Sequence, residues 1–428
     1  MKHCPQYKET EIGYIPNDWD IASLSDIGTF TKGNGISRAQ ARSGKIPCIR
    51  YGEIYTSHDN YIREFYSHIS PEIASIAKKL KKGDILFAAS GETKEDIGKA
   101  VAFVGSEEAY AGGDIIILSP QKHISSLFLG FVLNNSESVR QKSSMGQGDA
   151  VVHIHAAELS KVLVPLPDYA EQYAIADALK AIDSYILALT SLIKKKCLIK
   201  QGTMQNLLSG RIRLCGFNSD WIEIELGDIG KLTGAGVDKT INDGEKSVRL
   251  VNFLDVYNRD KIFSYNLNMW VTASDYKIQR CDVKCGDIFL TPSSELPNDI
   301  GRSAVAMADI NDACYSYHIL RLRPTIELDL NYSAYMFKTE QFEEQVRFLS
   351  EGSGKRYVIS LKNFREMRVT IPSDLKEQEA IGKVICSMDN EITALKAERD
   401  KYIQLKQGMM QKLLTGQIRL PKSCLKQE

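Results

Sequence analysis

The segment from Gly352 to Lys355 is the part of this 428-residue chain that comes closest to a nucleotide-binding motif. Its order Gly-Ser-Gly-Lys matches the end of a phosphate-binding loop, in which backbone amides and a lysine hold the phosphates. Leu349, however, stands where the first glycine of that motif belongs, and Arg356 replaces the Ser or Thr that binds magnesium. We therefore keep nucleotide hydrolysis at this loop only as an alternative.

Other residue types that support catalysis or metal binding occur without the required partners. The Gly146-Gln147-Gly148 turn lacks the third glycine and the following carboxylate of a dinucleotide site. Cys281 and Cys285 have no second Cys or His pair at ligand spacing. His153 and His155 have no acidic partner at a fixed spacing, so we interpret them as structural. The sequence also contains neither HExxH nor the Asn-Pro-Pro-aromatic run of amino-methyltransferases, and it predicts a chain that is not an enzyme and binds no cofactor or metal.

Composition restricts the class of protein further. The chain is 43% apolar and 25% charged with a net charge of zero, as in an ordinary globular protein, and its length predicts two to four domains. No apolar run approaches the roughly 18 residues that cross a bilayer, and the N-terminal segment lacks the apolar core of a signal peptide. The nine cysteines follow no disulfide framework. We therefore expect a cytoplasmic protein with reduced thiols and no membrane partner.

An internal repeat is the most informative pattern. The block KQGTMQNLLSGRIRL at 200–214 returns 206 residues later as KQGMMQKLLTGQIRL at 406–420, with eleven of fifteen positions identical. Further anchors recur at offsets of 202 to 206: Trp19 with Trp221, Gly28 with Gly230, Ile97-Gly98-Lys99 with Ile300-Gly301-Arg302, and Glu171-Gln172 with Glu377-Gln378. The chain is therefore predicted to contain two similar units.

Each repeat ends in a segment that is typical of a long helix. Apolar residues follow one another at steps of four and three from Ile175 to Ile193, and the second copy repeats them from Ile381 to Leu395. We expect helices of about 35 to 40 residues, each roughly 50 to 60 Å long. Either each apolar seam packs on its own unit, or the two seams pack on each other; we favour the second arrangement as an antiparallel pair.

The segments between the helices are predicted to form α+β domains. Short β-branched strands are expected at 83–89, 100–105, 114–118, 318–322 and 367–372, and the segments 125–142 and 333–350 are expected to be amphipathic and helical. The predicted order is a domain at 1–166, a helical region at 167–214, a second domain at 215–371 and a second helical region at 372–428, related by a pseudo-twofold. Residues 1–166 carry 18 basic and 19 acidic side chains, and 221–371 carry 19 and 22. Bulk charge would therefore contribute little to any affinity for DNA.

Several segments together resemble the specificity subunit of type I restriction-modification systems, and the resemblance covers nearly the whole chain. They are IGYIPNDWDIASLSDIG (12–28), IRYGEIY (49–55), GDILFAASGE (83–92), PLPDYAEQYAIADAL (165–179), QNLLSGRIRL (205–214) and QKLLTGQIRL (411–420). The resemblance implies two target-recognition domains, each reading one half of a bipartite, asymmetric site in double-stranded DNA. It also implies that the helices form a coiled coil, set the spacer and dock two adenine methyltransferase subunits. S-adenosylmethionine is then expected on those subunits, and ATP and Mg on restriction or translocase subunits.

Polar side chains on four repeated loops are the predicted DNA contacts, because such groups can enter a groove of the duplex. They are Lys32, Asn34, Ser37, Arg38, Lys239 and Thr240 in the first set; Ser90, Glu92, Thr93, Lys94, Ser293, Ser294 and Glu295 in the second; Gln147, Asp149, Ser353, Lys355, Arg356 and Tyr357 in the third; and Arg50, Tyr51, Tyr55, Asn252 and Tyr257 in the fourth. The simpler interpretation is that these turns close hairpins and satisfy local backbone groups. The alternative function is a coiled-coil scaffold that joins two protein-binding modules.

Overall fold

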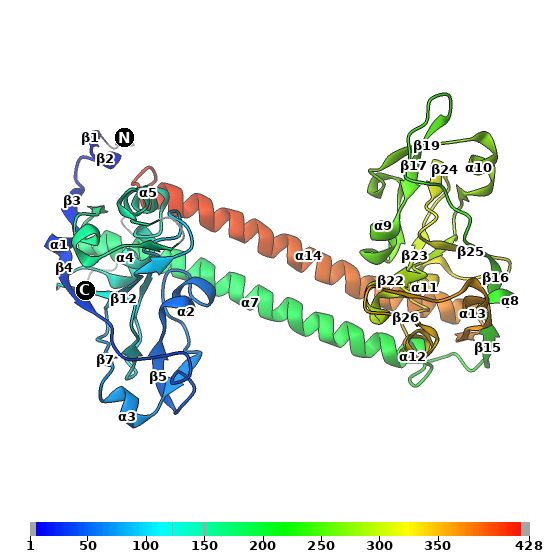
Figure 1. Ribbon diagram of the computed structural model, residues 1–428, viewed down its shortest axis with the longest axis horizontal. Coiled ribbons are helices and arrows are strands. Elements are labelled where there is room, and N and C mark those ends of the chain that lie inside the picture. Colours follow the sequence, from blue (N-terminus) through cyan, green and yellow to red (C-terminus); the bar gives the residue numbers. More distant parts are fainter. Residues whose placement is uncertain (1–5, 122, 149–150, 421–428) are drawn as a thin grey trace. The chain divides into compact units, whose positions relative to one another are not determined.

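A computed structural model describes residues 6–121, 123–148 and 151–420, so the predicted contact Asp149 lies outside the described residues. The chain divides into two compact units, which we call unit 1 (1–189 with 398–428) and unit 2 (190–397). Figure 1 labels the long helices and many of the shorter helices and strands. Both unit boundaries fall inside the long helices α7 (Tyr169–Leu208) and α14 (Leu375–Leu413), so each unit contains a part of both helices.

Unit 1 is built on two four-stranded sheets. The first is antiparallel, with the order β10 (Ala100–Ala102), β8 (Ile85–Ala88), β12 (Ile115–Pro120) and β4 (Gly28–Lys32). The second has the order β6 (Ser67–Ile69), β5 (Ile46–Ile49), β11 (Tyr110–Ala111) and β7 (Lys78–Lys79), with β5 and β11 parallel. Two-stranded ladders join β1 (Tyr7–Thr10) to β2 (Gly13–Pro16), β3 (Asp20–Ser23) to β14 (Leu163–Leu166), and β9 (Ser90–Gly91) to β13 (Val152–His153). The short helices are α1 (Leu24–Ile27), α2 (Tyr51–Thr56), α3 (Pro71–Ala74), α4 (Ser126–Val132), α5 (Ser136–Met145) and α6 (Ala156–Leu159).

Unit 2 repeats the order of the main strands and adds β18 (Lys261–Ile262) and β26 (Glu351–Ser353) to the corresponding sheets. Its first sheet has the order β16 (Gly230–Thr233), β25 (Leu320–Pro324), β21 (Ile288–Leu290), β23 (Ser303–Ala306) and β18 (Lys261–Ile262). Its second has the order β19 (Trp270–Ala273), β17 (Lys246–Val251), β24 (Ile310–Tyr315) and β20 (Asp282–Val283), again with its central pair parallel. The ladder of β15 (Trp221–Glu225) with β28 (Arg368–Pro372) matches that of β3 with β14, and a sheet of β22 (Ser293–Ser294), β27 (Arg356–Val358) and β26 (Glu351–Ser353) matches β9 with β13. The helices are α8 (Leu226–Ile229), α9 (Phe253–Tyr257), α10 (Asp275–Arg280), α11 (Leu330–Ser333), α12 (Glu340–Leu349) and α13 (Leu361–Glu366), with 3₁₀ turns η1 (Ser264–Asn266) and η2 (Pro297–Asp299).

The repeated glycines in this topology are explained by close strand approach. A Cβ atom at Gly28 would lie 2.3 Å from the carbonyl oxygen of Ser119, and one at Gly230 would lie 2.1 Å from that of Arg323. Both glycines begin the edge strand that pairs with β12 or β25. The predicted α+β class and the internal duplication are thus confirmed, and the repeated glycine serves packing in both copies.

The two long helices match the predicted ends and lengths. α7 has 40 residues and α14 has 39. Asp168 accepts a hydrogen bond from the Glu171 amide at 2.8 Å just before α7, as an N-cap does. Gly210 and Gly416 follow the helix ends with φ of +68° and +70°, the left-handed conformation that terminates a helix and favours glycine.

Within each unit, a part of α7 runs antiparallel to a part of α14, held by equivalent ion pairs. In unit 1 the Lys406 Nζ lies 2.6 Å from Asp183 Oδ1, and the ring of Tyr185 lies 4.6 Å from that of Tyr402. In unit 2, Lys200 and Asp389 form the corresponding pair at 2.5 Å. Lys200 and Lys406 belong to the repeated block, and Asp183 and Asp389 are also 206 residues apart. The antiparallel pairing predicted from the two seams is therefore present in both units.

Each apolar seam makes two kinds of contact. The sequence predicts that each seam packs either on its own unit or on the other seam. Ile175 and Leu179, near the start of α7, belong to the main core of unit 1, and Ile381 and Ile385 of α14 belong to that of unit 2. Farther along α7, Leu189 is 5% exposed, although it lies outside those cores. Each seam thus begins on its own domain and continues beyond it.

The segments 125–142 and 333–350 contain helices, as predicted, but neither is one continuous helix. The first segment contains α4 and α5, and the second contains the end of α11 and the separate helix α12. Asn135 accepts from the Ser138 amide at 2.8 Å and begins α5, and Thr339 accepts from the Phe342 amide at 3.2 Å and begins α12. A capping side chain competes for the backbone and starts a new helix, which an apolar pattern alone does not show.

In each unit, a buried glutamate near the start of one long helix binds an arginine that follows the end of the other. In unit 2, Arg213 donates to both carboxylate oxygens of Glu377, at 2.8 Å and 2.6 Å. In unit 1, Arg419 donates to Glu171 in the same way, and Trp19 donates from its indole nitrogen at 3.0 Å. Glu171 and Glu377 are 4% and 0% exposed. The neighbouring glutamines repeat the pattern, since Gln172 and Gln378 each hold a backbone amide and a proline carbonyl. The residues that are repeated most faithfully therefore hold the long helices to each unit.

Candidate nucleic-acid interface

An open groove in unit 2 brings together three of the four predicted loop sets. Its volume is about 600 Å³. The predicted residues that line it are Lys239, Ser293, Ser294, Glu295, Lys355 and Arg356. They come from the loop after β16, from β22 and its following turn, and from the hairpin between β26 and β27. Loops more than 100 residues apart thus form one surface, which we call the unit 2 groove.

Arg356 is the most precisely held cation in this groove. Its Nη2 donates to Ser293 Oγ at 2.9 Å, so one edge of the guanidinium is fixed while the side chain stays exposed. Ser293 itself is 9% exposed and lies on the strand that pairs with β27. A guanidinium held in this way keeps its other N–H groups available for a ligand with two acceptors.

The groove is electropositive at His318. Burial is the main cause that lowers the pKa of the His318 imidazole, and the positive charges of Lys239 and Arg356 lower it further. Glu295 and Asp299 also line the groove, so its positive charge is local. The surface therefore favours hydrogen-bond acceptors on its basic side.

A corresponding groove in unit 1 has a volume of about 630 Å³. Tyr51, Tyr55, Ser90 and Glu92 are the predicted residues that line it. The hydroxyl of Tyr55 donates to the Ser90 carbonyl at 2.9 Å, which fixes the ring beside the turn. Burial raises the pKa of this hydroxyl well above its usual range, so Tyr55 stays a neutral hydrogen-bonding group. We call this surface the unit 1 groove.

The two grooves share a framework and differ in lining. Strand registers pair Ser90 with His153 in unit 1 and Ser293 with Val358 in unit 2, so Val151 occupies the place of Arg356. Val151 lines the unit 1 groove as Arg356 lines the other. Tyr51 similarly stands where unit 2 has Phe253, the first residue of the equivalent helix. Both grooves contain two carboxylates, but the unit 1 groove has two tyrosines and one lysine, whereas the unit 2 groove has three cations.

The remaining predicted residues lie outside both grooves. Asn34 donates to the Ile76 carbonyl at 3.0 Å, and Thr93 donates to Asp96 at 2.7 Å. Asn252 accepts from the Leu254 amide at 2.9 Å as a helix cap, so its side chain serves the local fold. The others are exposed or half-buried: Lys32, Ser37, Arg38, Arg50, Lys94, Gln147, Thr240, Tyr257, Ser353 and Tyr357. Lys32 lines a separate hollow beside β4.

Several groove residues were missed by the sequence-based prediction. They are Asp96, Lys99 and Val151 in unit 1, and Phe253, Leu296, Asp299 and His318 in unit 2. Lys99 could have been found, because its position is repeated as Arg302 in the matched Ile-Gly-Lys and Ile-Gly-Arg segments. Asp96 and Asp299 could also have been found, because they precede these segments at the same offset of 203. The remaining residues have no repeated sequence pattern, and only the fold places them in the grooves.

Among residues 6–121, 123–148 and 151–420, no three His, Cys, Asp or Glu side chains are grouped as metal ligands would be. Over the same ranges, no helix combines the length and the apolar character that crossing a membrane requires.

Comparisons with known proteins agree on one family. The sequence model of the type I restriction modification DNA specificity domain matches residues 16–198 and 218–405. The chain is 24% identical to the putative type I restriction enzyme MjaX specificity subunit of Methanocaldococcus jannaschii, over 97% of both chains. It is 26% identical to the EcoKI specificity subunit of Escherichia coli over 40% of this chain and 37% of that one.

Solved structures show the same fold. The crystal structure of the type I restriction-modification S subunit from M. genitalium matches with a TM-score of 0.56 and 15% identity, over 96% of this chain and 98% of that one. A chain from a structure on complex assembly and conformational transition of the type I R-M system matches with a TM-score of 0.57 and 14% identity, over 94% and 99%.

Proposed function

The chain belongs to the type I restriction modification DNA specificity family, and from that premise we propose that its two grooves read the two halves of a bipartite DNA sequence. The chain is the specificity subunit of such a system, with two recognition domains. The observation that supports the grooves as readers is their shared framework with different linings. Equivalent loops would approach each half-site in the same way, and their different side chains would select different bases.

The lining of each groove favours a class of base. Arg356 has free N–H groups that suit the O6 and N7 acceptors of guanine, the commonest specific contact of arginine. In unit 1, the Glu92 carboxylate suits an amino donor such as cytosine N4, and Val151 suits the methyl group of thymine. We therefore propose a guanine in the half-site of unit 2 and a base with an amino donor in that of unit 1.

The reaction itself is proposed to occur on partner subunits. Two methyltransferase subunits carrying S-adenosylmethionine would dock on α7 and α14 and modify adenine, and restriction subunits would use ATP and Mg. The incomplete Gly352 to Lys355 motif and the relatives' names as specificity subunits support a chain without its own catalytic centre. The helices would also set the spacer, since a continuous helix resists bending between the positions that it connects.

Mapping the modified adenines tests this function directly. The chain would be expressed with its methyltransferase subunits in a host without other methylation, and the modified sites read by single-molecule sequencing. We expect one bipartite motif. Methylation without sequence preference, or none in a complex that has assembled, would favour the scaffold instead.

Variants then assign each groove to one half of the motif. Arg356→Val, which introduces the side chain found in unit 1, should relax one position of one half-site, with a loss of about 1–3 kcal/mol of discrimination. Glu92→Gln should relax a position in the other half. Lys231→Ala, an exposed change on β16 outside the groove, is the matched control and should leave both halves intact.

A further inference from the structure

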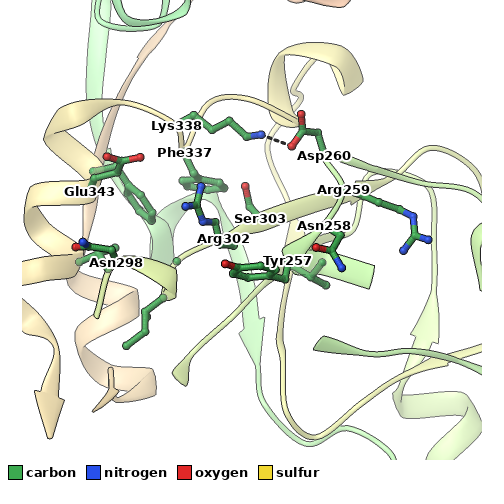
Figure 2. Close-up of a pocket in the computed structure, with 15 residues that line it drawn as sticks. Tyr257, Asn258, Arg259, Asp260, Asn298, Arg302, Ser303, Phe337, Lys338 and Glu343 are labelled. Atoms are coloured by element: carbon green, nitrogen blue, oxygen red, sulfur yellow. Dashed lines mark hydrogen bonds and ion pairs between the residues drawn. The ribbon is translucent and has the colours of Figure 1, made fainter. Parts of the chain in front are cut away.

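A smaller hollow in unit 2 adjoins the groove, since its Tyr257 donates to the groove residue Asp299 at 3.1 Å, and it contains a different set of polar groups. It is lined by residues of α9, β23 and α12 and has a volume of about 120 Å³. This is roughly eight times the space that one buried water requires. Figure 2 shows Arg302, Ser303 and Tyr257 gathered to one side of the Lys338 to Asp260 ion pair. We call this hollow the Arg302 pocket.

Ser303 gives the clearest indication that the pocket binds a polar ligand. The residue is 4% exposed, and its Oγ has no hydrogen-bond partner among the described residues. Buried hydroxyl groups are normally bonded, because desolvation without a partner is unfavourable. The side chain lines the pocket, so a bound molecule could supply the partner.

Arg302 is the unpaired cation of the pocket. Arg259 lies 2.8 Å from Asp255, and Lys338 is paired with Asp260, so both are neutralised locally. Arg302 has no ion pair among the described residues, and its Cζ lies 6.0 Å from the ring centroid of Tyr257. An arginine that rests on an aromatic face keeps its N–H groups at the guanidinium edge for another acceptor.

The other walls restrict the ligand's size and charge. Phe337 and Phe342 form an apolar floor, with ring centroids 4.9 Å apart and exposures of 2% and 1%. Glu343 is an exposed carboxylate on the opposite wall and forms no ion pair with another described residue. A small group with several acceptor oxygens matches a guanidinium and a hydroxyl, and it would be repelled by Glu343.

We propose that the Arg302 pocket binds a phosphate group, with Arg302 and Ser303 donating to its oxygens. Arginine suits phosphate because its planar N–H groups can bond two oxygens at once. The phosphate comes either from a free anion or from a DNA backbone, and the site itself does not depend on the proposed base readout.

The equivalent hollow of unit 1 has the opposite character and supplies a control. Lys99 takes the place of Arg302, and Asp59, Glu95 and Asp96 line the hollow beside it. Lys142 and Lys406 also line this hollow, but the Lys142 amine donates to the Gly98 and Leu133 carbonyls and Lys406 is paired with Asp183. The three carboxylates beside Lys99 therefore disfavour an anion. Phosphate should therefore bind in unit 2 alone.

Titration of the full-length chain with inorganic phosphate, followed by calorimetry, tests the proposal. We expect saturable binding of one phosphate per chain. Arg302→Ala should weaken it about tenfold or more, as expected for loss of a charge-assisted pair, and Ser303→Ala by a smaller factor. Glu343→Gln should tighten binding because it removes a repulsive charge. Lys99→Ala is the matched control and should leave the affinity unchanged.

Contrary outcomes are equally definite. The proposal is overturned if no saturation occurs below about 10 mM phosphate, or if Arg302→Ala leaves the affinity unchanged. Weaker binding in Glu343→Gln would also overturn it, since that result indicates a cationic ligand. A second readout excludes misfolding as the cause: phosphate should raise the unfolding temperature of the wild type but not of Arg302→Ala, while both unfold at equal temperature without phosphate.

Binding to DNA by the assembled complex distinguishes the two sources. If the phosphate belongs to DNA, Arg302→Ala should reduce the slope of log affinity against log salt by about one, and free phosphate should compete with DNA. If the ligand is a free anion, the slope should stay the same. Either result supports the site, provided that the titration has shown the binding.

Discussion

Replacing Glu377 with glutamine should loosen the attachment of the long helices to unit 2. Glu377 is 0% exposed and accepts from Arg213 at 2.8 Å and 2.6 Å. The substitution keeps one carbonyl acceptor and turns an amide N–H₂ towards the guanidinium. One charge-assisted bond is lost, which corresponds to about 1.5–3 kcal/mol. Because the Arg213 side chain is 30% exposed and keeps its 2.8 Å bond to the Ser219 carbonyl, we expect a loss of about 2 kcal/mol.

Denaturant unfolding combined with hydrogen exchange measures this effect. The free energy of unfolding should fall for Glu377→Gln, and amides at 208–214 and 375–380 should lose protection while unit 1 keeps its own. Glu379→Gln is the control, since Glu379 is two residues away on the same helix and exposed. Glu171→Gln should give the corresponding loss in unit 1, where Trp19 also donates to the carboxylate.

Two results would contradict the prediction for Glu377→Gln. A change below about 0.5 kcal/mol in Glu377→Gln would mean that the pair with Arg213 adds nothing to stability. Loss of protection in unit 1 but not in unit 2 would mean that Glu377 does not stabilise unit 2 through its pair with Arg213.

Three further predictions concern stability. Burial lowers the pKa of Lys142 to about 7, and its Nζ donates to the Gly98 and Leu133 carbonyls. Because the unfolded chain binds more protons than the folded chain between pH 7 and 10.5, the free energy of unfolding of unit 1 should rise by up to about 1.4 kcal/mol per pH unit in that range. Urea unfolding at several pH values should show a smaller rise with pH in Lys142→Met. Thr339→Ala removes the cap of α12 and should cost about 1 kcal/mol in denaturant unfolding, whereas an equal stability would show that the cap is unimportant. Gly416→Ala should lower the unfolding temperature of unit 1, because φ is +70° and a Cβ would lie 2.4 Å from Pro16 Cγ; Gly408→Ala, with open space around its Cβ position, is the control and should not.

The long helices and the edge strands that both units share could be predicted from the sequence because their residues are repeated. The Glu-Gln pair, the final arginine of each block and the glycine of each edge strand recur at nearly constant offsets, and each performs the same structural role in both units. Helix lengths and ends followed from apolar spacing and terminal glycines. The division of 125–142 into two helices did not, because Asn135 caps α5 within an apolar pattern that looks continuous.

The grooves could be predicted only in part, because each is assembled from segments far apart in the chain. The sequence marked the loops that carry Arg356 and Ser293, but 63 residues separate the two, and only the pairing of β22 with β27 joins them. The same pairing rule places Val151 where unit 2 has Arg356, a difference that no local motif contains. The sequence by itself determined the duplication, the long helices and the family, since these depend on local spacing and repeated residues. The tertiary structure alone decided which side chains face each groove and which polar groups remain unpaired, since both depend on contacts between distant strands.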